Sequence, residues 1–135
     1  MVLRKRAKPT PRARQRGAAA IEYALILPAL LMFVFGIIDT GRVVWTYTTL
    51  YRATEAAARC AAINTLDCGT AAQIQSYAAS QAWGMTIDAD AFKGTTEACG
   101  HQVTGTYDFQ FIIPLLNMPL GAVTLKATAC YPAKT

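Results

Sequence analysis

The sequence predicts an α+β protein: a long N-terminal helix that spans a membrane with its first half, then a short helix, then a small C-terminal antiparallel β-hairpin or sheet. Residues 18–38 form an apolar run with one ionisable side chain, and apolar residues continue at helical spacing to about Ile63. From Val103 the spacing changes to strict alternation, which is typical of half-buried strands. The predicted segments are a basic cytoplasmic leader (1–17), a long helix (18–63) whose first part (18–38) is transmembrane, and a small extracytoplasmic body (64–135).

The charge of the leader indicates its side of the membrane. Seven of the thirteen Lys and Arg residues fall in the first seventeen positions, and no acidic residue accompanies them. A basic arm can bind phosphates, so nucleic acid is one interpretation. The arm directly precedes the apolar run, however, and positive residues beside a first apolar segment stay cytoplasmic. We therefore expect a cytoplasmic N-terminus and no nucleic-acid partner.

The apolar run is long enough to cross a bilayer. Its 21 residues would extend about 30 Å as a helix, at roughly 1.5 Å per residue. A cleaved signal peptide is the alternative, but the stretch "GIIDTGRVVW" at the end of the run contains no convincing Ala-x-Ala site, and no two arginines are adjacent before the run. The prediction is a single-pass protein of the bacterial inner (cytoplasmic) membrane, with its C-terminal body in the periplasm or outside.

The four cysteines all follow the apolar run: Cys60, Cys68, Cys99 and Cys130. An even number in a small exported body predicts two disulfides. Zinc is disfavoured because the chain has no CxxC pair and a single histidine, His101. Pairing Cys60 with Cys68 and Cys99 with Cys130 is attractive, but Cys130 falls on the polar face of its strand, so the second pair needs a bulge at Gly100. Four cysteines allow three pairings, and the connectivity stays open.

Nothing in the sequence ends the helix at Ile38. Pro28 removes a backbone donor and predicts a kink in the preceding turn. Trp45 lies about two turns beyond Ile38, near the outer headgroup level, where Trp and Tyr anchor helices. The alternative for Trp45, Tyr47 and Tyr51 is a helix–helix contact in an assembly.

The body is predicted from its capping and alternation patterns. Thr70 with Gln73 three residues later resembles a capping box that opens a helix through Trp83, and Gly84 suits its end. Residues 86–100 are expected to form a loop because they contain turn formers and show no period. Strands are expected from Val103 to Phe111 and over residues 122–131, joined by a Pro-containing connection.

No catalytic constellation is recognisable, so we expect no enzyme, no cofactor, no metal and no small-molecule substrate. The sequence has no GxSxG or P-loop pattern and contains two serines only, Ser76 and Ser80. His101 has no obvious partner for general-base chemistry. Asp88 and Asp90 fall far short of the ligand series of an EF-hand and are expected to be solvated turn residues.

Glu22 is the one acid in the apolar run. A charged side chain at the centre of a membrane helix costs roughly 2.5 to 3.5 kcal/mol, and less near the edge. In the simplest interpretation Glu22 snorkels toward the cytoplasmic headgroups. In the functional interpretation, the Glu22 carboxylate has a partner in another chain.

The stretch around Glu22 favours the second interpretation. Gly17 closes the basic leader, and the Glu22–Tyr23 pair follows in "RGAAAIEYALILP". This resembles the processing site of type IV-like prepilins of the tight-adherence (Flp) branch. The segment from Arg16 to Arg59, including the Gly41–Arg42 step, is similar to the TadE-like family of pilus-associated proteins.

The resemblance implies cleavage by a prepilin peptidase between Gly17 and Ala18, leaving 135 − 17 = 118 residues. It also implies an assembly charge pair, in which Glu22 of one subunit meets the new Ala18 ammonium of a neighbour. Since the body is larger than a major pilin's, the implied function is that of a minor pilin or pseudopilin in assembly of a tight-adherence pilus or related secretion apparatus. Implied partners are the membrane, the peptidase, other pilin or pseudopilin subunits and the assembly platform. The alternative is an uncleaved, signal-anchored envelope protein with a periplasmic binding or interaction domain.

Overall fold

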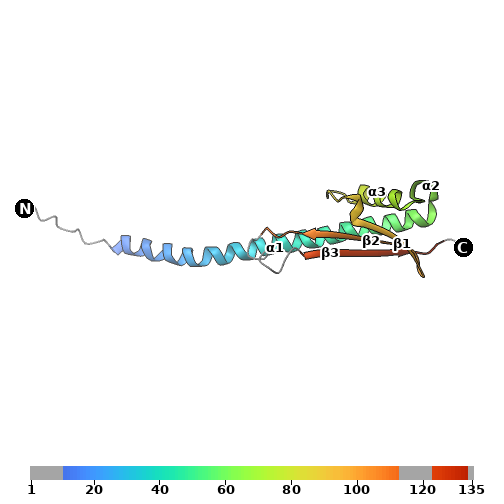
Figure 1. Ribbon diagram of the computed structural model, residues 1–135. Helices are drawn as coiled ribbons and strands as arrows, with labels where there is room; N and C mark the ends of the chain where they lie inside the picture. The colour runs from blue at the N-terminus through green and yellow to red at the C-terminus, as the bar shows by residue number, and fades with distance from the viewer. Residues whose placement is uncertain (1–10, 113–122, 134–135) are drawn as a thin grey trace, which may run out of the picture. The chain divides into compact units, whose positions relative to one another are not determined.

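A computed structural model describes the backbone of residues 11–112 and 123–133, and the side chains of residues 20–112 and 123–133. The chain divides into two compact units, residues 1–37 and residues 38–135. The elements are helices α1 (Pro11–Ile63), α2 (Thr65–Cys68) and α3 (Ala71–Gln81), the 3₁₀ turn η1 (Ala89–Ala91), and strands β1 (Phe92–Glu97), β2 (Gly100–Phe109) and β3 (Val123–Tyr131) (Figure 1). The α+β prediction, with a long first helix and a small antiparallel sheet, is confirmed.

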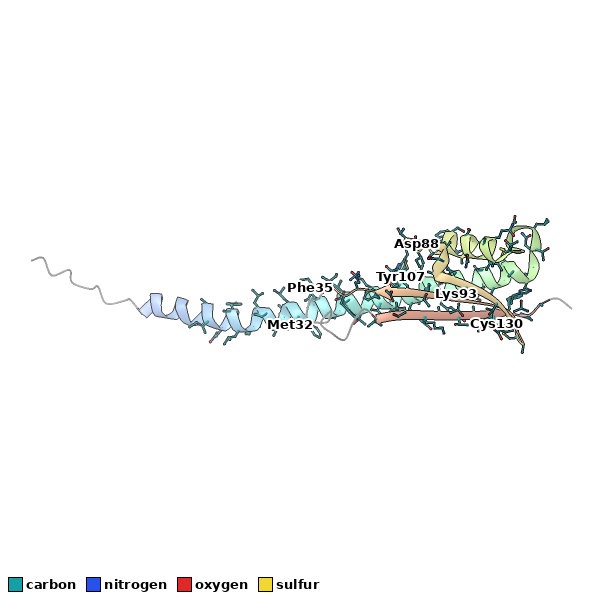
Figure 2. The ribbon with its side chains drawn as sticks, in the orientation of Figure 1. Met32, Phe35, Asp88, Lys93, Tyr107 and Cys130 are labelled. Carbon is teal, nitrogen blue, oxygen red and sulfur yellow. A yellow bond between two sulfur atoms is a disulfide. The ribbon has the colours of Figure 1, made fainter. Side chains whose placement is uncertain are left out.

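Helix α1 is continuous over its 53 residues and passes through Pro28 without a break in the helix assignment. It begins in the leader at Pro11, earlier than the expected Ala18. Proline is favoured at a first helical position because the missing N–H would have no helical partner there. In residues 20–35 every side chain is exposed, and Met32 and Phe35 extend from the helix surface (Figure 2).

The core of the second unit is built on small residues of α1. Leu50 and three alanines of α1 are at most 1% exposed, and they pack with residues of α3 and the sheet. Among the described residues, the buried members of this cluster are Leu50, Ala53, Ala57, Ala58, Ala78, Ala82, Phe92, Val103, Ala127 and Ala129. Alanine on two facing helices allows close approach, and the larger Leu50 and Phe92 fill the space that remains.

The sheet has the order β1-β2-β3 and is antiparallel throughout. Val103 pairs with Ala129 and Gly105 with Ala127, so the apolar positions that alternate along the two predicted strands share one face. A Cβ atom at Gly105 would lie 2.8 Å from the Phe92 ring and 3.0 Å from Leu50 Cδ1. Glycine is required at this position because α1 and the Phe92 ring approach the strand closely.

Strand β1 corrects the sequence prediction, which assigned residues 86–100 to a loop. Residues 92–97 pair with β2 from Phe92 opposite Gly105 to Glu97 opposite Gly100. Only Phe92 is fully buried on this edge strand, and Gly94 stands at the next inward position, where Ile74 of α3 covers it. A strand with one large buried residue gives almost no period-2 signal, which is why alternation did not reveal it.

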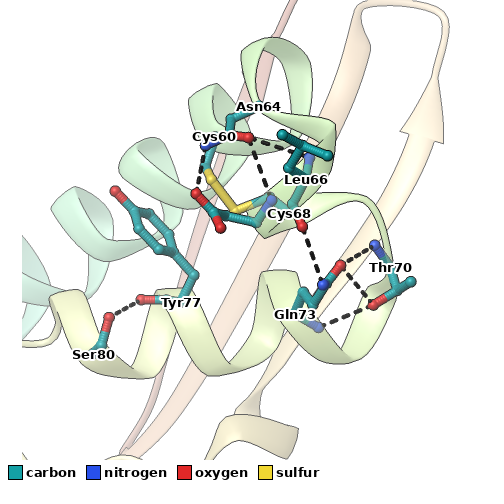
Figure 3. The surroundings of a disulfide bond; sticks show 9 residues. Cys60, Asn64, Leu66, Cys68, Thr70, Gln73, Tyr77 and Ser80 are labelled. Atoms are coloured by element: carbon teal, nitrogen blue, oxygen red, sulfur yellow. Dashed lines mark hydrogen bonds between the residues drawn. A yellow bond between two sulfur atoms is a disulfide. The ribbon is translucent and has the colours of Figure 1, made fainter.

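The predicted capping box is present at the start of α3. The Thr70 hydroxyl accepts the Gln73 N–H at 3.3 Å, and the Gln73 carboxamide accepts the Thr70 N–H at 3.0 Å (Figure 3). The helix ends at Gln81, slightly before the predicted Trp83, and Gly84 follows with a positive φ of 75°. Thr70 therefore satisfies an otherwise unpaired helix donor, as the sequence predicts.

Both disulfides of the attractive scheme are formed. Cys60, in the last turn of α1, is bonded to Cys68, the last residue of α2, and Cys99 is bonded to Cys130 of β3 (Figure 3 shows the first). Cys99 lies in the two-residue turn between β1 and β2, so it is not bound by the face alternation of either strand. Gly100 follows with a φ of 120°, and a side chain there would collide with the Tyr131 carbonyl. The connection predicted between the last two strands lies largely outside the described residues.

Candidate functional site

The residues of the predicted processing site all lie in α1. Gly17 and Ala18 fall within its first turns, and their side chains are not described. Glu22 is exposed, and Tyr23 is 74% exposed. Positions 18 and 22 are four apart in one helix and therefore share a face. Cleavage itself and the pairing of Glu22 with Ala18 stay predictions.

The segment that carries Glu22 has the properties of a membrane span. A window of 18 residues within Ala20–Ile63 has a mean hydropathy of 2.3 and is 0% buried in the structure. Among the described residues no side chain forms an ion pair or hydrogen bond with the Glu22 carboxylate. This acid is therefore placed on an apolar helix surface that the rest of the described chain leaves open.

A second charged site lies where the body begins, and the sequence interpretation missed it. Asp39 is 2% exposed, although it directly follows the apolar run. Its carboxylate accepts the Ile112 N–H with both oxygens, at 3.2 and 3.1 Å, and Arg42 Nη1 lies 2.8 Å from Asp39 Oδ1. Ile112, which follows β2, is thus hydrogen-bonded to Asp39, in the part of α1 where the second unit begins.

Arg42 makes further contacts at this place. We call the set of contacts among Asp39, Arg42 and Ile112 the Asp39–Arg42 junction. Its guanidinium carbon lies 5.0 Å from the centre of the Phe109 ring, and Nη1 is 3.5 Å from the Gln110 carbonyl oxygen. Phe109 in turn packs edge-on against Phe111, with ring centroids 5.2 Å apart. Burying a carboxylate is expensive unless it is paired, and here backbone N–H and guanidinium together satisfy it. The signal available in the sequence was the i, i+3 spacing of Asp39 and Arg42 at the end of an apolar run.

The residues considered for chemistry do not come together. His101 lines a hollow of about 270 Å³ whose other polar residues are threonines and a glutamine, with no acid. Asp88, just before η1, and Asp90, within η1, are both exposed, and Asp88 is seen at the surface in Figure 2. Within the part of the chain that the structure describes, no group of three His, Cys, Asp or Glu side chains is placed to hold a metal ion. The four cysteines are all used in disulfides.

The fold and these two sites define a class of protein: one apolar N-terminal helix able to span a membrane, continuing into a small disulfide-braced α+β body. Residues 17–59 match the family model described as TadE-like protein. The match confirms the resemblance over this segment and indicates a membrane protein associated with the tight-adherence (Tad) pilus. It starts at Gly17, includes Glu22, Asp39 and Arg42, and ends inside α1, before the sheet. No curated protein and no solved structure matches the chain.

Proposed function

We propose that this chain is a minor pilin or pseudopilin-like subunit that takes part in assembly of a tight-adherence pilus or a related secretion apparatus. The observation that carries the proposal is the position of Glu22: it is exposed on an apolar helix, five residues after Gly17, where the family match begins. A prepilin peptidase cuts after Gly17, and the 118-residue product enters the assembly from the inner membrane with its body outside the cytoplasm.

Glu22 acquires its partner through this cut. The new α-amino group of Ala18 has a reference pKa of about 8 and is mostly charged near neutral pH. Glu22 of one subunit accepts hydrogen bonds from the Ala18 ammonium of the next, so that each charge neutralises the other in a medium of low dielectric constant. The exposed large side chains of residues 20–37 then pack against neighbouring helices or lipid.

The role is structural and not enzymatic in this proposal. The pilin subunits, the peptidase and the assembly platform are the partners, and the body displays its disulfide-braced surface outward. A signal-anchored envelope protein without cleavage is the competing function. It uses the same helix as an anchor but gives no role to Gly17 or Glu22.

Intact-mass analysis of the membrane-extracted protein distinguishes the two functions. In cells that contain the matching prepilin peptidase we expect a mature chain beginning at Ala18. A Gly17→Leu variant should retain the leader, while Gly36→Leu, a change of the same kind farther along α1, should be processed normally. A wild-type chain that keeps residues 1–17 in those cells would contradict the proposal.

The charge pair is tested in the same cells by Glu22→Gln. This variant should insert in the membrane but co-purify at least about tenfold less with pilus assemblies, because the Ala18 ammonium then lacks its counter-charge. Glu55→Gln is the matched control, since Glu55 is an exposed acid in the body half of the same helix. Equal incorporation of both variants would count against the pair.

A further inference from the structure

Among the described residues of the second unit, exposed large apolar side chains are unevenly distributed. Six of them belong to one end of the body and form what we call the basal ring: Ile38, Val44, Trp45, Trp83, Ile112 and Val123, which are 42 to 75% exposed. Two lie along α1, Tyr47 and Tyr51, and the remaining two, Ile63 and Leu66, are beside the Cys60–Cys68 disulfide at the far end of the helix. The body is therefore apolar mainly at the end where the chain enters it from the apolar run.

Contacts within the unit place the members of the basal ring at the same end. Asp39, next to Ile38, binds the Ile112 N–H, and Val123 pairs with Phe109, whose ring lies against Arg42. Along α1, Ile38 and Trp45 are seven residues apart, which is about 10 Å of helix.

Trp83 reaches this end from the turn after α3. It forms a groove of about 390 Å³ together with Trp45 and other residues of α1 and α3. A neighbouring hollow joins Ile38 and Trp45 to Gly84 and Met85 of the same turn. Apolar side chains are thus exposed at this end of the body by four segments: the start of the body half of α1, the turn after α3, the residues that follow β2 and the start of β3.

We propose that the basal ring inserts in the headgroup region of the extracytoplasmic leaflet, so that the body is seated on lipid and does not extend freely from its helix. Lipid is the expected partner of the basal ring because the chain runs directly from the apolar run into the ring. The apolar run ends at Ile38, the first residue of this unit, so the ring begins where the hydrocarbon ends. Trp and Tyr are the side chains favoured at this depth, since an apolar ring system and a polar N–H or O–H are both accommodated there. The exposed part of the Arg42 side chain adds a cation at phosphate level.

This inference rests on the membrane anchoring in the proposed function, but not on cleavage or assembly. It assigns Trp83 a role that neither the family match nor the sequence suggests, because Trp83 lies outside residues 17–59. It also gives the Asp39–Arg42 junction a purpose: the junction holds Ile112 at the lipid surface.

The chain contains two tryptophans, Trp45 and Trp83, which makes the proposal measurable by fluorescence. The full-length protein is placed in nanodiscs of phosphatidylethanolamine and phosphatidylglycerol, one chain per disc, as two single-tryptophan variants, Trp45→Phe and Trp83→Phe. A control chain carries Leu66→Trp with both native tryptophans changed to phenylalanine, because Leu66 is 86% exposed at the far end. Circular dichroism verifies that each variant is folded.

Lipids brominated near the headgroup should quench Trp83 about as strongly as Trp45, and at least about twofold more than the tryptophan at position 66, because interfacial rings lie within reach of the bromine atoms. Acrylamide in the water should show the reverse order. Trp83 quenched by acrylamide alone, with Trp45 still quenched by lipid, would overturn the seated body while leaving the anchor intact. Trp83 protected from both quenchers would also overturn it, because with one chain per disc the rest of the chain itself would then cover Trp83.

Discussion

The two halves of α1 differ in which side chains they expose, although both are rich in apolar residues. In residues 20–35 every side chain is exposed, including Leu25, Phe33 and other large ones. In residues 38–63 half of the buried positions are alanine, such as Ala53 and Ala57, each 0% exposed, and the only large buried side chain is Leu50. One helix therefore has bulky residues where its surface is left open by the chain and small residues where another element packs on it.

The comparison shows that apolar content alone does not identify a core. The 18-residue window of mean hydropathy 2.3 has no buried side chain among the described residues, whereas the core lies in the second half of α1, whose buried apolar residues are small apart from Leu50. The difference fits the proposed environments: a helix that is anchored in a membrane has apolar side chains toward lipid, whereas the second half must approach α3 and the sheet closely.

The largest expected effect comes from truncating the same residue type in the two environments. Phe92 is 0% exposed in the core, whereas Phe33 is 69% exposed in the first half of α1. Phe92→Ala should lower the free energy of unfolding of the body by about 3 to 5 kcal/mol, since it leaves a cavity. Phe33→Ala should leave it unchanged. Urea unfolding of the full-length protein in nanodiscs, followed by circular dichroism, measures both, and equal losses would show that the core and the first half of α1 are not distinct environments.

The two disulfides are expected to differ in how much they stabilise the body. Cys99–Cys130 closes a loop with a sequence separation of 31, and Cys60–Cys68 one of 8. The chain-entropy model gives about 3.7 and 2.5 kcal/mol for these separations, because the longer loop restricts the unfolded chain more. Double Cys→Ser variants of each pair, compared by urea midpoint, test the order. A larger loss from the Cys60–Cys68 pair would show that native-state contacts at the end of α1 outweigh the loop term.

Local patterns predicted most of the fold. The alternation of apolar and polar residues predicted β2 and β3, and the Thr70 and Gln73 pair predicted the start of α3. Apolar residues at helical spacing predicted that α1 continues to Ile63. Each of these signals lies within a short stretch of consecutive residues, because backbone geometry and side-chain chemistry there determine the local secondary structure directly. The sequence also suggested the disulfide pairing that is observed. The face alternation that argued against Cys99–Cys130 does not apply, because Cys99 lies in the turn before β2.

What the sequence concealed depends on contacts between distant segments. Strand β1 is held mainly by pairing with β2 and by Ile74 over Gly94, and its own pattern is too weak to reveal it. The burial of Asp39 depends on Ile112, 73 residues away. The basal ring needs Trp83 beside Trp45, which no spacing rule predicts. Glu22 was found because a family motif surrounds it, and its partner remains a proposal.

A smaller effect is expected at Arg42, which lies where the two halves of α1 meet. Arg42→Ala removes the cation from the buried Asp39 carboxylate, but the Ile112 N–H still binds both oxygens and water can approach, because the Arg42 side chain is 44% exposed. We therefore expect a loss of about 1 to 3 kcal/mol in the free energy of unfolding, below the cost of stranding a fully buried charge.

Arg59→Ala is the control for this change, since Arg59 is an exposed arginine of the same helix without an ion pair among the described residues, and it should change stability by less than about 0.5 kcal/mol. Asp39→Asn with Arg42→Ala should lose less than the sum of the single variants, because the two side chains interact directly and their effects are not independent. Strict additivity in this cycle would mean that Arg42 acts through Phe109 and Gln110 alone. The junction would then be held by packing on the guanidinium and by contacts of the Asp39 carboxylate other than that with Arg42, among them the Ile112 N–H.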